Sequence, residues 1–172
     1  LINNNNVSSL VELDLRNCYT ITEHQIYKCL TSAYDLKHLN LNRKLLYSPT
    51  QAENTYDKDK FDHFKSNFLL SDNILHAIQI SKPNLETFAM SGSKISEYSI
   101  WQLIAQTPSI RMSLKRISLN ECLNLQENFF KIFQSNILPN LQVLELKYFD
   151  HVENIELISK KLFEFRLSQE LK

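Results

Sequence analysis

One short pattern of apolar residues, here called the apolar phrase, occurs five times along the chain, and it constrains the fold more than any other feature. In the first copy, Leu10, Leu13 and Leu15 are followed three residues later by Cys18. The same spacing of apolar positions returns in copies that begin at Leu36, Leu85, Leu114 and Leu141. Apolar residues two positions apart in so short a run predict a strand that buries one face and shows the other to solvent.

A helix start follows the strand phrases. Thr22, Ser71 and Ser96 each stand between an apolar residue and an acidic one. A hydroxyl side chain at this position predicts a helix N-cap, and the acid would then lie in the first turn, where the helix dipole favours negative charge. Weaker copies begin at Leu125 and Val152. The apolar stripes that follow predict amphipathic helices, and they are clearest at Ile26, Cys29, Leu30 and Ala33 and at Ile100, Leu103, Ile104 and Thr107.

This alternation predicts an α/β fold, a leucine-rich-repeat solenoid in which a curved parallel sheet is covered by outer helices, with about five to six repeats. Residues 1–9 are interpreted as a linker or the end of a preceding segment, and residues 10–172 as the repeat domain. The second repeat is about 23 residues too long, which predicts an inserted surface loop at about 43–67. A sixth, shorter strand is expected at Leu162.

Composition excludes several functional classes. The formal net charge is zero, so no basic surface is expected for nucleic acid or an anionic membrane. No apolar run reaches the ~18 residues of a membrane span. The three cysteines lack the spacing of a zinc site or a disulfide framework, which favours an intracellular protein, cytoplasmic or nuclear. Cys18 and Cys122 share one repeat position and are interpreted as small, partly buried side chains, with Cys29 on a helical stripe.

Catalytic motifs are scarce. Gly92 is the single glycine, so the chain has neither a glycine-rich phosphate loop nor a GxSxG turn. We therefore expect no enzyme activity, no cofactor and no metal site. The aspartates and histidine at 57–63 alternate with lysines and are interpreted as a solvated loop, and the other histidines as isolated surface or helix residues. Trp101 is expected to be a packing residue first and a partner-contact residue second.

The first repeat resembles the cysteine-containing leucine-rich repeats of F-box proteins. The matching residues are Leu13, Leu15, Cys18, Ile21, Thr22, Glu23 and Ile26, and Leu119, Cys122, Leu125 and Glu127 match the same pattern in part. The second, third and fifth repeats lack the cysteine. The resemblance implies the substrate-binding repeat domain of an SCF-type ubiquitin ligase receptor, with a Skp-type adaptor and a cullin as further partners if an F-box lies outside these residues. The alternative is a structural or assembly subunit that uses the repeats as a scaffold.

A protein partner is expected on the concave face of the sheet, where side chains between the buried leucines point outward. Simple solvation of the same residues is the alternative, and the sequence leaves open which face is used. Thr87, Ala89 and Ser91 form the small central part of this face. The predicted contact residues are Glu12, Asp14, Arg16, His38, Asn40, Asn42, Arg116, Ser118, Asn120, Glu145, Lys147 and Tyr148.

Overall fold

The computed structural model describes residues 7–43, 69–122, 124–125, 129, 132 and 137–146 of the 172-residue chain. The inserted loop predicted at about 43–67, from residue 44 onward, and the strand expected at Leu162 lie outside the described residues.

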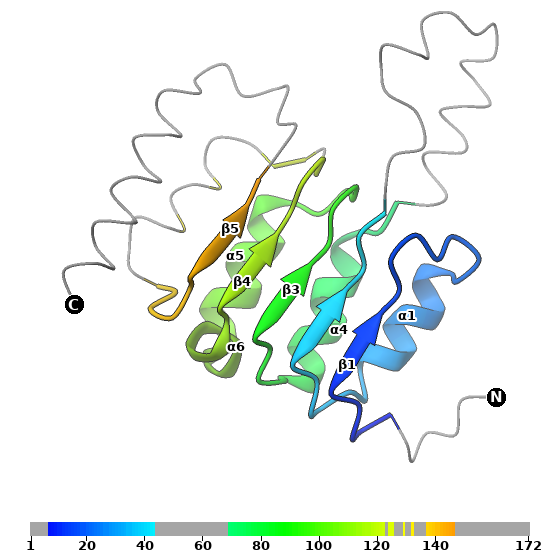
Figure 1. The fold of residues 1–172 in the computed structure, drawn as a ribbon, viewed down its shortest axis with the longest axis horizontal. Coiled ribbons are helices and arrows are strands. Elements are labelled where there is room, and N and C mark those ends of the chain that lie inside the picture. The colour runs from blue at the N-terminus through cyan, green and yellow to red at the C-terminus, as the bar shows by residue number, and fades with distance from the viewer. Residues whose placement is uncertain are drawn as a thin grey trace, which may run out of the picture.

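Five parallel strands form one sheet in the order of the sequence (Figure 1). Each strand coincides with one copy of the apolar phrase, and the central residues pair in register from Leu13 through Leu39 and Phe88 to Ile117 and Leu144. The predicted α/β class with a parallel sheet is therefore confirmed. The strands are β1 (Glu12–Asp14), β2 (His38–Asn40), β3 (Thr87–Ala89), β4 (Arg116–Ser118) and β5 (Val143–Glu145).

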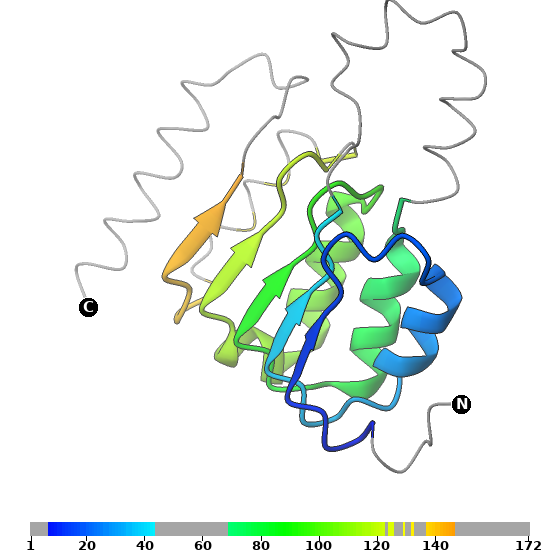
Figure 2. The same ribbon diagram turned by 45° about the vertical axis from the view of Figure 1, so that its right-hand side comes forward.

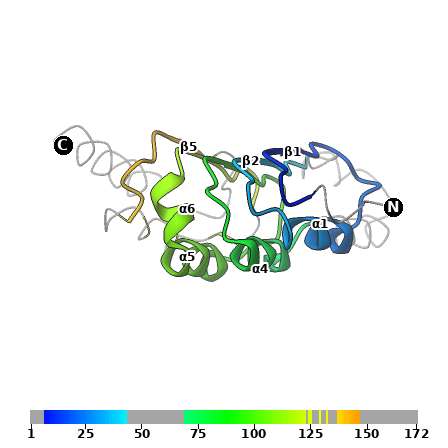
Figure 3. The same ribbon diagram turned by 90° about the horizontal axis from the view of Figure 1, so that it is seen from below.

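The described helices all lie on one face of the sheet (Figures 2 and 3). The three longer ones begin directly after the predicted caps, and the side chains of Thr22, Ser71 and Ser96 accept backbone N–H bonds from their first turns. The fourth helix was not predicted; it starts at a proline, which suits the first turn of a helix because its missing N–H has no partner there. The helices are α1 (Glu23–Leu30), α4 (Asp72–Ser81), α5 (Glu97–Gln106) and α6 (Pro108–Ser113).

A single apolar layer between the sheet and the helices forms the core. Leu39, Met90 and Leu119 enter it from the strand side, and Ile26 and Ile100 from the helix side. No repeat can bury these residues alone, so neighbouring repeats stabilise one another.

The folded part of the chain begins before the predicted boundary at residue 10. Val7 is only 7% exposed and belongs to the core, and the carbonyl of Ser8 accepts a hydrogen bond from the backbone N–H of Asp35 at 3.2 Å. At least these residues of the segment interpreted as a linker are therefore packed against the first repeat.

The chain leaves three of the strands through a left-handed turn. Asn17, Gly92 and Glu121 lie at equivalent positions, three residues after the last strand residue, with φ of 56°, 64° and 56°. The residue that follows packs inward, as Cys122 does with 4% exposure. In the third repeat this place is taken by Ser93, whose hydroxyl donates to the carbonyl of Met90 at 3.1 Å.

Cys122 is therefore buried more fully than the partial burial predicted for it, and serine occupies the same place where the cysteine is missing. Cys18, at the equivalent position of the first repeat, is only partly buried.

Gly92 is the position where the turn tolerates no side chain. A Cβ atom there would lie 1.9 Å from the carbonyl oxygen of Arg43, on the neighbouring repeat. We expect Gly92→Ala to lower the free energy of unfolding by at least ~1–3 kcal/mol, because left-handed strain and this overlap add. Glu121→Gly, at the equivalent turn, should leave stability unchanged or higher. Urea unfolding of both variants is the measurement, and an unchanged midpoint for Gly92→Ala would contradict the turn geometry.

Burial also predicts the reactivity of a thiol. Removal from water raises the pKa of Cys122 to about 11, because the thiolate is poorly solvated there. At pH 8 only about one molecule in a thousand would carry this thiolate. We expect iodoacetamide to modify the partly buried Cys18 before Cys122 in the native protein and both in denaturant, as read by peptide mass spectrometry. Fast native modification of Cys122 would show that its repeat is open.

Candidate protein-interaction surface

The face of the sheet opposite the helices carries the residues predicted to bind a partner. We call this the open sheet face and define it by the outward residues of β1–β5 with Arg16, Asn42, Ser91 and Asn120, which follow the strand ends. Strand register arranges it in rows. One row contains Glu12, His38, Thr87, Arg116 and Val143, and the next contains Asp14, Asn40, Ala89, Ser118 and Glu145.

The register thus brings together ten of the twelve predicted contact residues, although Ser118 is buried with 4% exposure and not open to solvent as predicted. Lys147 and Tyr148 lie outside the described residues. That these residues bind a partner stays a prediction.

The β1 edge of the open sheet face is charged but internally paired. The guanidinium Nε of Arg16 lies 2.9 Å from Asp14 Oδ2, and the backbone N–H of Arg16 donates to Asp14 Oδ1 at 3.0 Å. That backbone hydrogen bond, assisted by the guanidinium, lowers the pKa of Asp14 below its usual value. Both side chains are exposed, so the pair contributes little to stability.

The centre of the open sheet face is a network of amides and hydroxyls. Asn42 Oδ1 accepts from the backbone N–H of Ser91 at 2.8 Å, and Ser91 Oγ accepts from that of Asn120 at 3.1 Å. Asn40 and Ser118 take part as well: Asn40 Oδ1 accepts from Asn42 N–H, and Ser118 Oγ accepts from Asn120 Nδ2. The side chains of Asn40, Asn42 and Ser91 satisfy backbone groups where the strands end, so two predicted contact residues, Asn40 and Asn42, also have a structural task.

Arg116 differs from its neighbours on the open sheet face. His38 Nδ1 and Thr87 Oγ1 lie 3.1 Å apart and share a hydrogen bond. Beside them the Arg116 side chain is exposed and forms no hydrogen bond or ion pair with any described residue. A free guanidinium next to a hydroxyl is suited to a carboxylate or a carbonyl of a partner.

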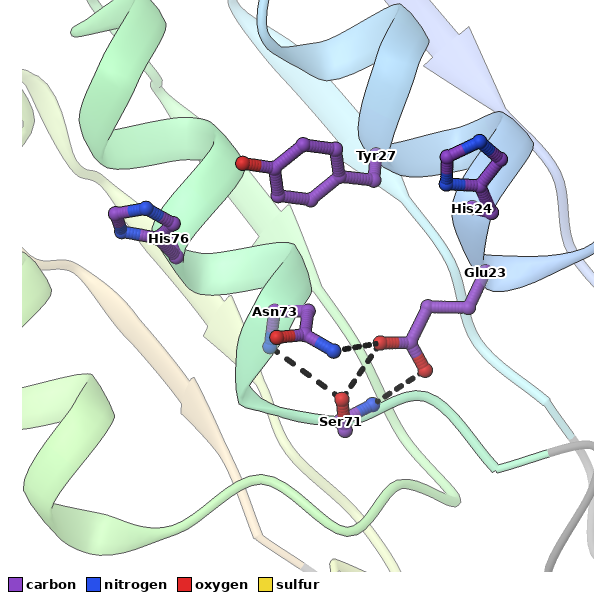
Figure 4. A pocket seen from close by; sticks show the side chains of 6 residues that line it. All are labelled: Glu23, His24, Tyr27, Ser71, Asn73 and His76. Carbon is purple, nitrogen blue, oxygen red and sulfur yellow. Dashed lines mark hydrogen bonds between the residues drawn. The ribbon is translucent and has the colours of Figure 1, made fainter.

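On the helical side, two of the three first-turn acids hold the start of the next helix. Glu23 Oε1 accepts from Ser71 Oγ at 2.6 Å and from Asn73 Nδ2 at 3.0 Å, and Glu23 Oε2 accepts from the backbone N–H of Ser71 at 3.2 Å (Figure 4). Asp72 repeats the arrangement with the N–H and hydroxyl of Ser96 at 2.7 and 2.8 Å. The sequence pattern of hydroxyl and acid predicted each cap but not this link between repeats.

We call the bonding of a first-turn acid to the N-cap of the next helix the acid-to-cap link. The first and last helices of this series differ from the middle one. At the start, the Thr22 N–H is satisfied inside its own helix by Gln25 Oε1 at 2.9 Å, so α1 needs no acid from a preceding helix. At the other end, Glu97 Oε2 is buried and has no hydrogen-bond partner among the described residues.

A groove of about 520 Å³ lies between α1 and α4 (Figure 4). Tyr27 and His76 face one another across it with ring centroids 6.4 Å apart, and Glu23, His24, Ser71 and Asn73 complete the lining. Trp101, expected to serve packing first, is instead 41% exposed on α5. The buried positions of this turn are filled by its neighbours Ile100 and Ile104.

Within the described ranges, the structure offers no group of three or more histidine, cysteine or acidic side chains that could hold a metal ion. No helix in that part of the chain is long and apolar enough to cross a membrane.

Curated proteins with similar sequences include two that carry the same name. No family model matches the chain. Over 155 residues the chain is 27% identical to the antagonist of mitotic exit network protein 1 of Candida albicans, a match that covers 86% of this chain and 22% of the relative. The protein of the same name from Eremothecium gossypii is 33% identical over 75 residues, 43% of this chain and 18% of the relative. The chain thus matches about a fifth of the length of these relatives.

The acid-to-cap link predicts a difference between two otherwise similar acids. Asp72→Ala leaves the N–H of Ser96 without its acceptor and removes the closer acceptor of its hydroxyl, so the free energy of unfolding should fall by about 1–3 kcal/mol. Glu97→Ala is the matched control, because it removes a first-turn acid whose Oε2 accepts no bond, and about 0.3–1 kcal/mol is expected from the helix dipole alone. Equal losses in thermal unfolding of the two variants would argue against the link between repeats.

Proposed function

We propose that this chain is a non-catalytic protein-interaction domain, a leucine-rich-repeat solenoid that binds a protein partner on the open sheet face. The observation that carries the proposal is the in-register array of outward side chains on five strands, which the described helices leave uncovered. Repeat surfaces of this kind suit extended protein contacts, whereas the described residues offer no pair of acid and base in a closed site.

Arg116 is the residue on which we expect recognition to centre. Asp14 and Arg16 pair with each other, and the Asn40 and Asn42 amides accept from backbone N–H groups, whereas the Arg116 guanidinium has no described partner. Arginine with free donors is typical of the few residues that dominate binding energy.

The relatives support a regulatory role. Both carry the name antagonist of mitotic exit network protein 1, and we extend from it to this chain only a regulatory task carried out by binding other proteins. Because the chain matches about a fifth of each relative, the activity of the whole protein is part of the proposal.

The finer proposal is the substrate-binding repeat domain of an F-box-type ubiquitin ligase receptor, acting inside the cell. It is supported by the hydroxyl and acid of the repeat, Thr22 and Glu23, whose roles at the helix start agree with the repeat that the chain resembles. The other possibility is a scaffold subunit of a large complex. A Skp-type adaptor and a cullin would be partners of the first kind of protein only.

The test is affinity purification of the full-length parent protein, followed by mass spectrometry. Recovery of a Skp-type adaptor and a cullin would support the ligase receptor, and a fixed assembly without them would support the scaffold. For the partner so identified, Arg116→Ala should weaken binding about tenfold or more. Lys28→Ala, an exposed cation on the helical side, is the control. Unchanged binding of Arg116→Ala would contradict the role of the open sheet face.

A further inference from the structure

Three ring side chains form a row across the helical layer. Tyr27, His76 and Trp101 are each the fifth residue after the N-cap of their helix, in α1, α4 and α5 respectively. These helices lie side by side (Figure 3), and the first two rings are 6.4 Å apart. We call Tyr27, His76 and Trp101 the ring row.

His76 and Trp101 of the ring row are exposed, Tyr27 is partly buried, and neighbouring residues extend the row. Trp101 is 41% exposed, and Tyr98, one turn earlier on α5, is 64% exposed with its hydroxyl accepting from Gln102 Nε2 at 2.7 Å. Large aromatic side chains in water on neighbouring helices are typical of contact surfaces, because they bury much area at little entropic cost. The groove between α1 and α4 gives this surface depth beside Tyr27 and His76.

Charge beside the ring row selects the partner. The first-turn acids Glu23, Asp72 and Glu97 follow the same line of helix starts. The donors that bind Glu23 and Asp72 are hydroxyl, amide and backbone groups, which are neutral and leave the negative charges in place.

Cations are arranged differently on the described helical side. Lys28 and Arg111 lie in last turns of their helices, and Lys82 is the C-cap of α4. Arg43 is close enough for the charge of Glu23 to act on it, but its side chain is buried and donates to the carbonyl of Ile21. Lys94 stands before the start of α5. Among the described residues, no ion pair joins Glu23 or Asp72 to a cation, although the buried Arg43 lies near Glu23.

We propose that the ring row and the α1–α4 groove form a second interaction surface, which binds an arginine-bearing or lysine-bearing segment of a protein partner. The cationic side chain lies over Tyr27 and His76 with Glu23 at the end of the groove, and an apolar neighbour in the partner covers Trp101. A cation over an aromatic face is worth about 0.5–2 kcal/mol, and a nearby carboxylate adds to it. This surface lies on the opposite side of the sheet from the open sheet face and does not rest on the function proposed for that face.

Trp101 is the single tryptophan, so its fluorescence reports on this surface directly. The probe is acetylated tetra-arginine amide, titrated into the full chain at low salt, with tetra-citrulline amide as the uncharged control of equal shape. We expect a saturable change in Trp101 emission and amide shifts in α1 and α4 by two-dimensional NMR, with citrulline at least tenfold weaker. Equal binding of both peptides, no binding, or shifts confined to the strands would overturn the proposal.

Two variants locate the site. Tyr27→Ala and His76→Ala should each weaken tetra-arginine binding several-fold, because each removes one ring beside the groove. Arg116→Ala, on the open sheet face, should leave tetra-arginine binding unchanged. The experiment can therefore contradict the second interaction surface without contradicting the open sheet face, and the reverse. If a ring variant unfolds, the arginine and citrulline peptides still decide the question with the unaltered chain.

Discussion

The in-register pairing of five parallel strands is the constraint on which the rest of the structure depends. It sets the central residues from Leu13 to Leu144 in one line and therefore aligns the helices that follow. Only in that alignment does the carboxylate of Glu23 reach Ser71, and that of Asp72 reach Ser96. Hydrogen bonds in the sheet, burial in the core and acids at the helix starts thus act between neighbouring repeats and reinforce one another.

The two outer surfaces differ because their polar side chains have different hydrogen-bond partners. On the open sheet face, Asn42 and Ser91 satisfy backbone groups at strand ends, and Arg116 is left to meet a partner. On the helical side the acids satisfy the caps, and rings such as Trp101 remain in water. Sheet and helices therefore present a polar surface and an aromatic, acidic one from a single repeated unit.

Sequence reasoning predicted the local parts well because they are encoded within a few residues. The caps at Thr22, Ser71 and Ser96 follow from one hydroxyl and the residues after it, and the outward rows follow from alternation along a strand. Helix α6 was missed because six residues carry too little periodicity. The buried Val7 was missed because its burial depends on the first repeat, which its own sequence neighbours do not reveal.

The sequence by itself determined the repeating unit: a short strand, a tight turn and a capped helix, with their apolar sides. Periodicity and capping are local, so the order of residues is sufficient to specify them. Only the tertiary structure decided which side chains meet across repeats. The contacts of Gly92 with the Arg43 carbonyl, of Glu23 with Ser71 and of Tyr27 with His76 join residues 48 or 49 positions apart in the chain. Such contacts exist only once the strands are paired.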